Sequence, residues 1–126
     1  MKPNPRPKIL LVDDEEDLLT DLRAFLEEEG YEVVTALDGE TALKKIEEEK
    51  PNLILLDLNI PKLSGFQILE RIKPKESGIK VLIFSGVATP EEKEKLLALG
   101  ACDCLNKPIS IKALLEEIEK AIEEKS

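Results

Sequence analysis

The sequence predicts a single α/β domain in which five parallel strands form a doubly wound sheet in the order 2-1-3-4-5. Three observations lead to this fold class. The chain has 126 residues, which is the size of one compact domain. Short aliphatic runs alternate with amphipathic charged segments, and this alternation is typical of a parallel sheet covered by helices on both faces. The core must be aliphatic, because the chain has one Tyr, three Phe and no Trp.

The strands are predicted from short segments rich in apolar residues, with no apolar run longer than four, that end at charged or turn residues. We expect strands at Lys8–Val12, Tyr31–Thr35, Leu53–Asp57, Ile79–Phe84 and Ala101–Leu105. The runs LILL and VLIF are apolar throughout, as expected of strands buried on both faces.

The helices are predicted between the strands from apolar residues at helical spacing. The first has Leu18, Leu19, Leu22, Phe25 and Leu26 on one face and ends at Gly30. The others are predicted at Thr41–Lys50, Gly65–Lys73, Pro90–Leu99 and Ile111–Ile122. Ser110 is expected to cap the last helix. Prolines at positions 3, 5 and 7 make residues 1–7 an extended tail. The domain is therefore expected to span residues 8–124.

Composition excludes several classes of function. The formal net charge is −9, which argues against nucleic acid or an anionic membrane as a partner of this domain. No apolar run exceeds four residues, so no membrane span is expected. There is no His, which removes the Ser-His-Asp triad and His-ligated zinc. Two Cys imply no disulfide framework, and we expect a cytoplasmic protein.

Polar residues follow the predicted strands at the edge where such sheets carry their functional crevice. Asp13 and Asp14 follow strand one, Asp57 ends strand three, Ser85 follows strand four, and Lys107-Pro108 follows strand five. Alone, each residue has a simple structural explanation as a helix cap, a turn residue or a surface residue. Strands one and three are neighbours in this order, so the three carboxylates should converge and need a cation. Hard oxygen ligands suit Mg²⁺.

These residues together resemble the receiver domain of two-component response regulators, whose fold is flavodoxin-like. The resemblance rests on Val12-Asp13-Asp14-Glu15, Asp57-Leu58-Asn59-Ile60-Pro61 with Gly65, Ser85-Gly86, and Gly100-Ala101 running to Lys107-Pro108. It covers residues 8–124 and implies that Asp57 accepts a phosphoryl group from a partner phosphohistidine. It also implies that the domain is a signalling module that assists its own phosphorylation and dephosphorylation.

The resemblance assigns a role to each matching residue. Asp14 would bind Mg²⁺ directly and Asp13 mainly through water, with Asp57 and the backbone carbonyl of Asn59 completing the protein ligands; Mn²⁺ is an alternative metal. The Ser85 hydroxyl and the Lys107 ammonium would each contact a phosphoryl oxygen. The Lys107-Pro108 peptide is expected to be cis, which aims the lysine into the pocket.

One position departs from the family pattern. The family's switch aromatic, three residues before the lysine, is Cys104 here. A thiol cannot act as the same rotameric plug, so we expect a smaller response on phosphorylation, or one read on the face of the first helix. Asn59 and Val87 border the path of the attacking water in the family. The apolar Val87 suggests slow self-dephosphorylation.

The implied partners are a sensor histidine kinase or a histidine phosphotransfer protein. A downstream protein would bind the first helix or the face made by helix 90–99, strand 101–105 and helix 111–122. We expect a monomer, with a dimer on phosphorylation as the alternative. The chain could be a stand-alone regulator, a phosphorelay intermediate, or a receiver fragment of a larger regulator or hybrid kinase.

Three rival functions differ at single features. An aspartyl-nucleophile phosphatase usually carries a second acid two residues after the nucleophile, where this chain has Asn59. A receiver-like interaction domain that works unphosphorylated commonly lacks one of the acids, the serine or the lysine. A flavin-binding domain would need Gly, Ser and Thr in the first loop, which here is acidic.

Overall fold

The computed structural model describes residues 6–86 and 88–123. Five parallel strands form one sheet in the order β2-β1-β3-β4-β5, as predicted. The strands are β1 (Lys8–Val12), β2 (Glu32–Ala36), β3 (Leu53–Leu56), β4 (Lys80–Ser85) and β5 (Asp103–Asn106). The helices are α1 (Glu16–Glu28), α2 (Gly39–Glu49), α3 (Gly65–Ile72), α4 (Pro74–Ser77), α5 (Pro90–Ala98) and α6 (Ile111–Glu123). Within the described ranges no helix is long and apolar enough to cross a membrane.

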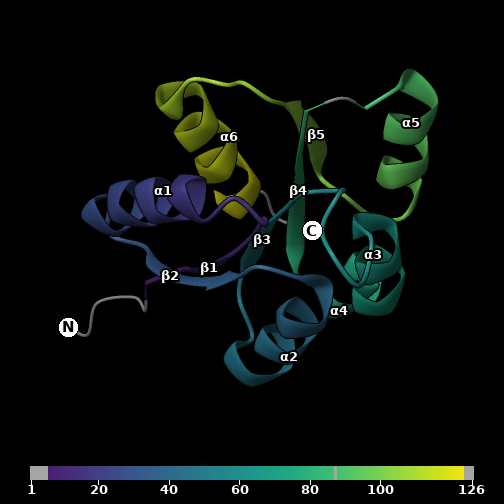
Figure 1. Cartoon of the computed structure of the whole chain (residues 1–126), viewed down its shortest axis with the longest axis horizontal. Coiled ribbons are helices and arrows are strands. Elements are labelled where there is room, and N and C mark those ends of the chain that lie inside the picture. The colour runs from purple at the N-terminus through teal and green to yellow at the C-terminus, as the bar shows by residue number, and fades with distance from the viewer. Residues whose placement is uncertain (1–5, 87, 124–126) are drawn as a thin grey trace.

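The sheet separates two hydrophobic cores, and Figure 1 shows helices on both of its faces. The core under α1 and α6 contains Ile9, Leu11, Leu55 and Ile118. The core under α2, α3 and α5 contains residues such as Leu10, Val12, Ile54, Ile68 and Leu96. Adjacent residues of one strand enter opposite cores, because successive side chains of a strand alternate between faces. This explains why the interior positions of the central strands β1, β3 and β4 are all apolar.

Two predictions about the elements need correction. A plain break was expected at Pro74, but Pro74–Ser77 forms the one-turn helix α4. Proline is suited to the first position of a helix, because its fixed φ fits and its missing N–H would have no partner there. The last strand begins at Asp103 rather than Ala101. The other predicted boundaries agree with the structure to within two residues.

Side-chain caps hold the loops at the carboxyl edge of the sheet. Ser64 and Thr89 form capping boxes with Gln67 and Glu92 at the starts of α3 and α5. Ser110 accepts a hydrogen bond from the N–H of Ala113, which confirms the predicted cap of α6. These caps fix where each helix leaves the edge that carries the candidate site.

Ion pairs hold the opposite end of the sheet. The Lys8 ammonium at the start of β1 lies 2.9 Å from a carboxylate oxygen of Glu49 and 3.4 Å from one of Glu32. Lys8 therefore connects β1 to the end of α2 and the start of β2.

Candidate functional site

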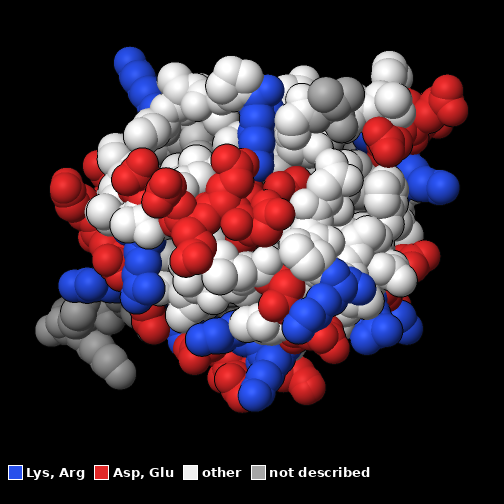
Figure 2. All heavy atoms as spheres, in the orientation of Figure 1, with Lys and Arg blue, Asp and Glu red and all other residues white. Residues whose placement is uncertain are grey.

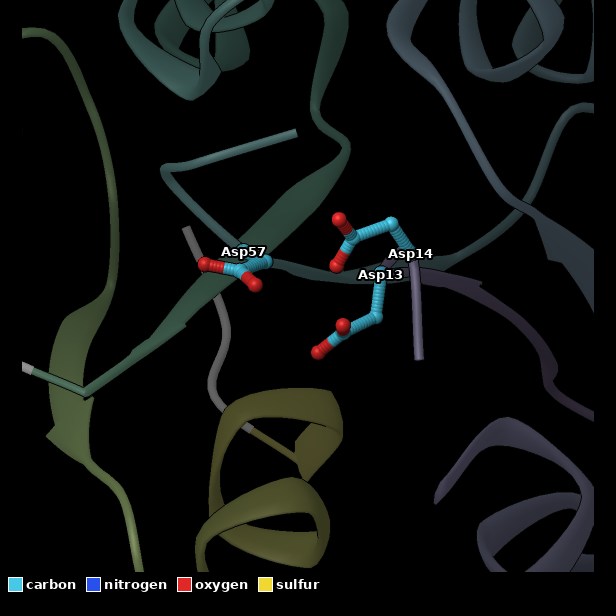
Figure 3. A group of neighbouring side chains, drawn as sticks. All are labelled: Asp13, Asp14 and Asp57. Carbon is cyan, nitrogen blue, oxygen red and sulfur yellow. The ribbon is translucent and has the colours of Figure 1, made fainter. Parts of the chain in front are cut away.

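Three carboxylates converge where β1 and β3 end, as the sequence predicts. One oxygen each of Asp13, Asp14 and Asp57 lie within 4.8 Å of one another. Asp13 and Asp57 are buried, whereas Asp14 is exposed. Figure 3 shows the three side chains reaching into a shared space between the two strand ends. In Figure 2, acidic side chains gather near the middle of the visible face.

Backbone pairing places the two buried aspartates side by side. The N–H of Asp13 donates to the carbonyl of Ala36 at the end of β2, at 3.2 Å. The N–H of Asp57 donates to the carbonyl of Val12 at the end of β1, at 3.0 Å. The ladder thus continues one residue beyond each strand, so the aspartates inherit the register of the sheet.

The two buried carboxylates have the same local hydrogen bond. Oδ1 of Asp13 accepts from the N–H of Glu15 at 3.0 Å. Oδ1 of Asp57 accepts from the N–H of Asn59 at 3.1 Å. In both cases an aspartate binds the backbone two residues later, which is the Asx-turn arrangement. Each carboxylate therefore has one oxygen held by its own loop.

Lys107 connects the second oxygens of these carboxylates. Its Nζ lies 2.7 Å from Oδ2 of Asp13 and 3.3 Å from Oδ2 of Asp57. It also lies 3.2 Å from a carboxylate oxygen of Glu15. The Lys107-Pro108 peptide is cis, as predicted. The backbone N–H of Lys107 donates to the carbonyl of Ser85 at 2.7 Å. Lys107, which directly follows β5, thus contacts residues at the ends of β1, β3 and β4.

Charges and burial shift two pKa values in the pocket. Burial raises the pKa of Asp57, and the charge of Asp13 adds to this effect, while the Asn59 N–H and Lys107 oppose it. Burial by itself lowers the pKa of Lys107, but the hydrogen bond to Asp13 and the charges of Asp13 and Asp57 outweigh it and raise that pKa. The raised pKa keeps Lys107 positively charged at neutral pH, and ionisation of Asp57 in this pocket costs folding free energy.

The remaining predicted residues differ in where they lie. Ser85 is fully buried at the end of β4, beside the backbone of Lys107. Asn59 is exposed in the loop after β3. Cys104 is buried in the core under α5, and burial raises the pKa of its thiol. Neither Cys102 nor Cys104 forms a disulfide. Val87 lies outside the described residues.

Two neighbours of Lys107 were missed from the sequence. Glu15 belongs to the quoted motif but was given no role, and it is 92 residues away from Lys107 in the chain. The Phe84 ring has its centroid 5.1 Å from the Lys107 ammonium, within the range of a cation–π contact. The alternation of β4 predicts the direction of Phe84, but no sequence signal predicts that a lysine lies over its ring.

The donor set of the pocket fits a hard divalent cation. It offers three carboxylates, and the chain has no His. Oxygen ligands of this kind suit Mg²⁺, which keeps several waters and often shares its site with phosphate.

Comparison with known proteins agrees with the fold and the pocket. The sequence model of the response regulator receiver domain matches residues 9–119. The chain belongs to this family, whose members are the phosphoacceptor modules of two-component systems. Receiver domains bind Mg²⁺ in an acidic pocket and are phosphorylated by histidine kinases.

Individual relatives carry the same domain. The alkaline phosphatase synthesis transcriptional regulatory protein PhoP of Bacillus subtilis is 44% identical, over 90% of this chain and 50% of its own length. Response regulator RR06 of Streptococcus pneumoniae is 37% identical, over 90% of this chain and 52% of its own. The chain thus spans about half the length of these relatives.

Solved structures show the same architecture. The CheY-like receiver domain from Methanospirillum hungatei superposes with a TM-score of 0.88 at 35% identity, covering 94% of each chain. The receiver domain of NtrX from Brucella abortus gives a TM-score of 0.84 at 33% identity, over 93% of this chain and 99% of that chain.

Proposed function

We propose that Asp57 is the phosphoacceptor and that its phosphoryl group comes from a phosphohistidine on a partner protein. The supporting observation is the buried Asp57 carboxylate with a backbone N–H on Oδ1 and the Lys107 ammonium on Oδ2. In the transfer, a carboxylate oxygen of Asp57 attacks phosphorus and an O–P bond forms. The N–P bond to the donor imidazole breaks, and the imidazole nitrogen keeps the electron pair.

The other pocket residues would neutralise and orient the phosphoryl group. Asp13, Asp14 and Asp57, together with the backbone carbonyl of Asn59, would hold Mg²⁺, or Mn²⁺ in its place. The bound metal supplies positive charge to the phosphoryl oxygens, which is most of what phosphoryl transfer asks of a protein. Lys107 would exchange its contact with Asp57 for a phosphoryl oxygen. The Ser85 hydroxyl would bind another phosphoryl oxygen.

Acetyl phosphate provides a direct test of the acceptor. With Mg²⁺, the protein should gain the mass of one phosphoryl group, in an adduct that is stable to acid and labile to base. Asp57→Asn should gain none, whereas the matched change Asp21→Asn on exposed α1 should behave as the wild type. An adduct that survives Asp57→Asn contradicts the proposal. Turnover of many phosphoesters without a lasting adduct supports the aspartyl-nucleophile phosphatase instead.

The switch is proposed to depend on Ser85 and to be damped at Cys104. Movement of Ser85 toward the phosphoryl group would carry the β4–α5 loop with it. The contact between Ser85 and the phosphoryl group would exist only in the phosphorylated state, and only contacts that differ between two states can shift their equilibrium. Cys104 has no ring to move, so the α5-β5-α6 face changes less, or the response appears on α1. Asn59 and Val87 would set the lifetime of the acyl phosphate.

The proposed partners follow from the domain's chemistry. The donor is a sensor histidine kinase or a histidine phosphotransfer protein, since the chain itself has no His. A downstream protein would bind the α5-β5-α6 face or the α1 face. The domain, which we take as residues 8–124, would be a monomer, with a dimer formed on phosphorylation as the alternative. Its net charge of −9 argues against direct contact between this domain and nucleic acid.

We propose two settings for the domain: a stand-alone receiver or phosphorelay intermediate, and the receiver of a larger regulator or hybrid kinase. Relatives that are named transcriptional regulators are about twice the length of the matched region. A match to half of each relative's length is expected whether this receiver is joined to a second module or stands alone. Phosphorylation of Asp57 has the same chemistry in both settings.

A further inference from the structure

The loop between β3 and α3 carries Asp57 and Asn59, and the first turn of α2 holds it from outside the pocket. The N–H of Gly39 donates to the carbonyl of Pro61 at 3.0 Å. A Cβ at position 39 would overlap the Cβ of Leu63 and lie 3.0 Å from its backbone. The loop therefore packs against the bare backbone of α2, and this close approach requires glycine.

A charged contact reinforces this packing. The Lys62 ammonium lies 3.4 Å from a carboxylate oxygen of Glu40 and 3.9 Å from one of Asp38. Lys62 has a φ of 75°, in the left-handed region that residues other than glycine rarely adopt. Asp38 also caps α2 by accepting from the N–H of Thr41 at 2.8 Å. The lysine thus ties the loop to a side chain that is itself held by α2.

The loop is also confined on its other side, where it meets the start of α3. The N–H of Gly65 donates to the carbonyl of Leu58 at 3.0 Å. A Cβ at position 65 would lie 2.9 Å from the Leu58 side chain and 3.2 Å from the carbonyl oxygen of Asp57. Leu58 and Ile60 are buried. We therefore expect a displacement of Pro61 to be transmitted through the buried Ile60 to Asn59, two residues away.

We propose that Gly39 and Lys62 are positioning residues for the phosphorylation site. Through Pro61 they hold Asn59, whose N–H orients Oδ1 of Asp57 and whose carbonyl is a proposed metal ligand. Among the described residues, no hydrogen bond or ion pair joins Gly39 or Lys62 to Asp13, Asp57 or Lys107. The inference rests on the proposed function of Asp57, and its test separates the two.

Lys62→Met is the main test, and Lys73→Met is its matched control. Lys73 also has a left-handed backbone (φ 49°) and an exposed side chain, but it forms no ion pair in the part of the chain that the structure describes. Both variants lose one positive charge. Lys62→Met should slow phosphorylation by acetyl phosphate and weaken Mg²⁺ binding, each by roughly twofold to fivefold, because the ion pairs that it loses are exposed and contribute modestly. Lys73→Met should match the wild type.

Hydrogen exchange gives a readout that needs neither metal nor phosphate. In the metal-free protein, the Asn59 amide should exchange about twofold to fivefold faster in Lys62→Met than in Lys73→Met, because its hydrogen bond to Asp57 should open more often. Unchanged exchange at Asn59 together with unchanged Mg²⁺ affinity overturns the inference. If the wild type forms no acyl phosphate, the proposed function fails, while exchange and Mg²⁺ binding still decide the positioning role.

Gly39→Ala tests the packing contact. It should produce the same changes more strongly than Lys62→Met, because the new methyl group must displace Leu63. If Gly39→Ala does not fold, Lys62→Met decides alone. A folded Gly39→Ala protein with wild-type exchange at Asn59 contradicts the inference.

Discussion

The ammonium group of Lys107 lies closer to Asp13 than to Asp57, at 2.7 Å against 3.3 Å. The lysine therefore neutralises charge on both Asp13 and Asp57, and not on the proposed acceptor alone. Asp13 and Asp57 are also proposed Mg²⁺ ligands, so Mg²⁺ that binds the metal-free protein would compete with Lys107 for these carboxylates.

Lys107→Met should bind Mg²⁺ more tightly and accept phosphate more slowly. Removing the competing ammonium should raise Mg²⁺ affinity roughly threefold to tenfold, since one charged hydrogen bond contributes on the order of 1 kcal/mol or more. Phosphorylation should slow, because a charge that neutralises the phosphoryl group is lost. Calorimetry and the acetyl phosphate assay measure the two effects. Lys112→Met, an exposed lysine on α6, is the control. Mg²⁺ affinity that falls in Lys107→Met contradicts the competition.

Asp57→Asn should stabilise the metal-free protein at neutral pH. Burial raises the pKa of Asp57 above its ordinary value of 3.8, so ionisation of this group destabilises the folded state. This destabilisation is absent below pH 3.8 and grows as the pH rises through the folded-state pKa. The gain in unfolding free energy should therefore be present at pH 7 and vanish on acidification. Urea unfolding across this range, with Asp21→Asn as the control, measures the difference. A gain that persists at low pH would have another cause.

Gly65→Ala should destabilise the protein by about 1–3 kcal/mol, as overpacking of a tight contact does. The new methyl group would meet the Leu58 side chain and the backbone of Asp57. Gly86→Ala provides a matched comparison, because nothing lies within 4 Å of a Cβ at that position. Urea unfolding of both variants measures the effect. Equal stability of the two variants would contradict the prediction, since it would show that the loop accommodates the methyl group at little cost in free energy.

Phosphorylation should change the amide chemical shifts of β5 and α5 less than those of the loops around Asp57. The side chain at position 104 is a small buried thiol, which offers no ring to reorient. Cys104→Ala should leave this pattern unchanged, with Cys102→Ala as the control. NMR spectra with and without beryllofluoride, a stable mimic of the phosphoryl group, measure both. Shift changes along β5 and α5 as large as those around the pocket, or a pattern altered by Cys104→Ala, would refute the prediction.

The sequence predicts the sheet order and the convergence of Asp13, Asp14 and Asp57, because strand ends in a doubly wound sheet share one edge. The sequence does not predict individual side-chain contacts between residues that lie far apart in the chain. Glu15 reads as an ordinary residue before a helix, and its contact with Lys107 spans 92 positions of the chain. Lys62 likewise reads as a surface lysine, although it pairs with Asp38 and Glu40. Helix α4 was missed because proline ends one helix and begins another with the same φ.

The interior of β1 does not by itself specify its alignment in the sheet. Ile9, Leu10, Leu11 and Val12 are all aliphatic, so a slip by one residue would still bury apolar side chains in both cores. The charged ends distinguish the correct alignment, since Lys8 meets Glu49 at one end and Asp13 meets Lys107 at the other. A slipped strand would separate both ion pairs at once and turn Asp13 away from the pocket. The acid needed for the proposed chemistry is thus also a marker of correct folding.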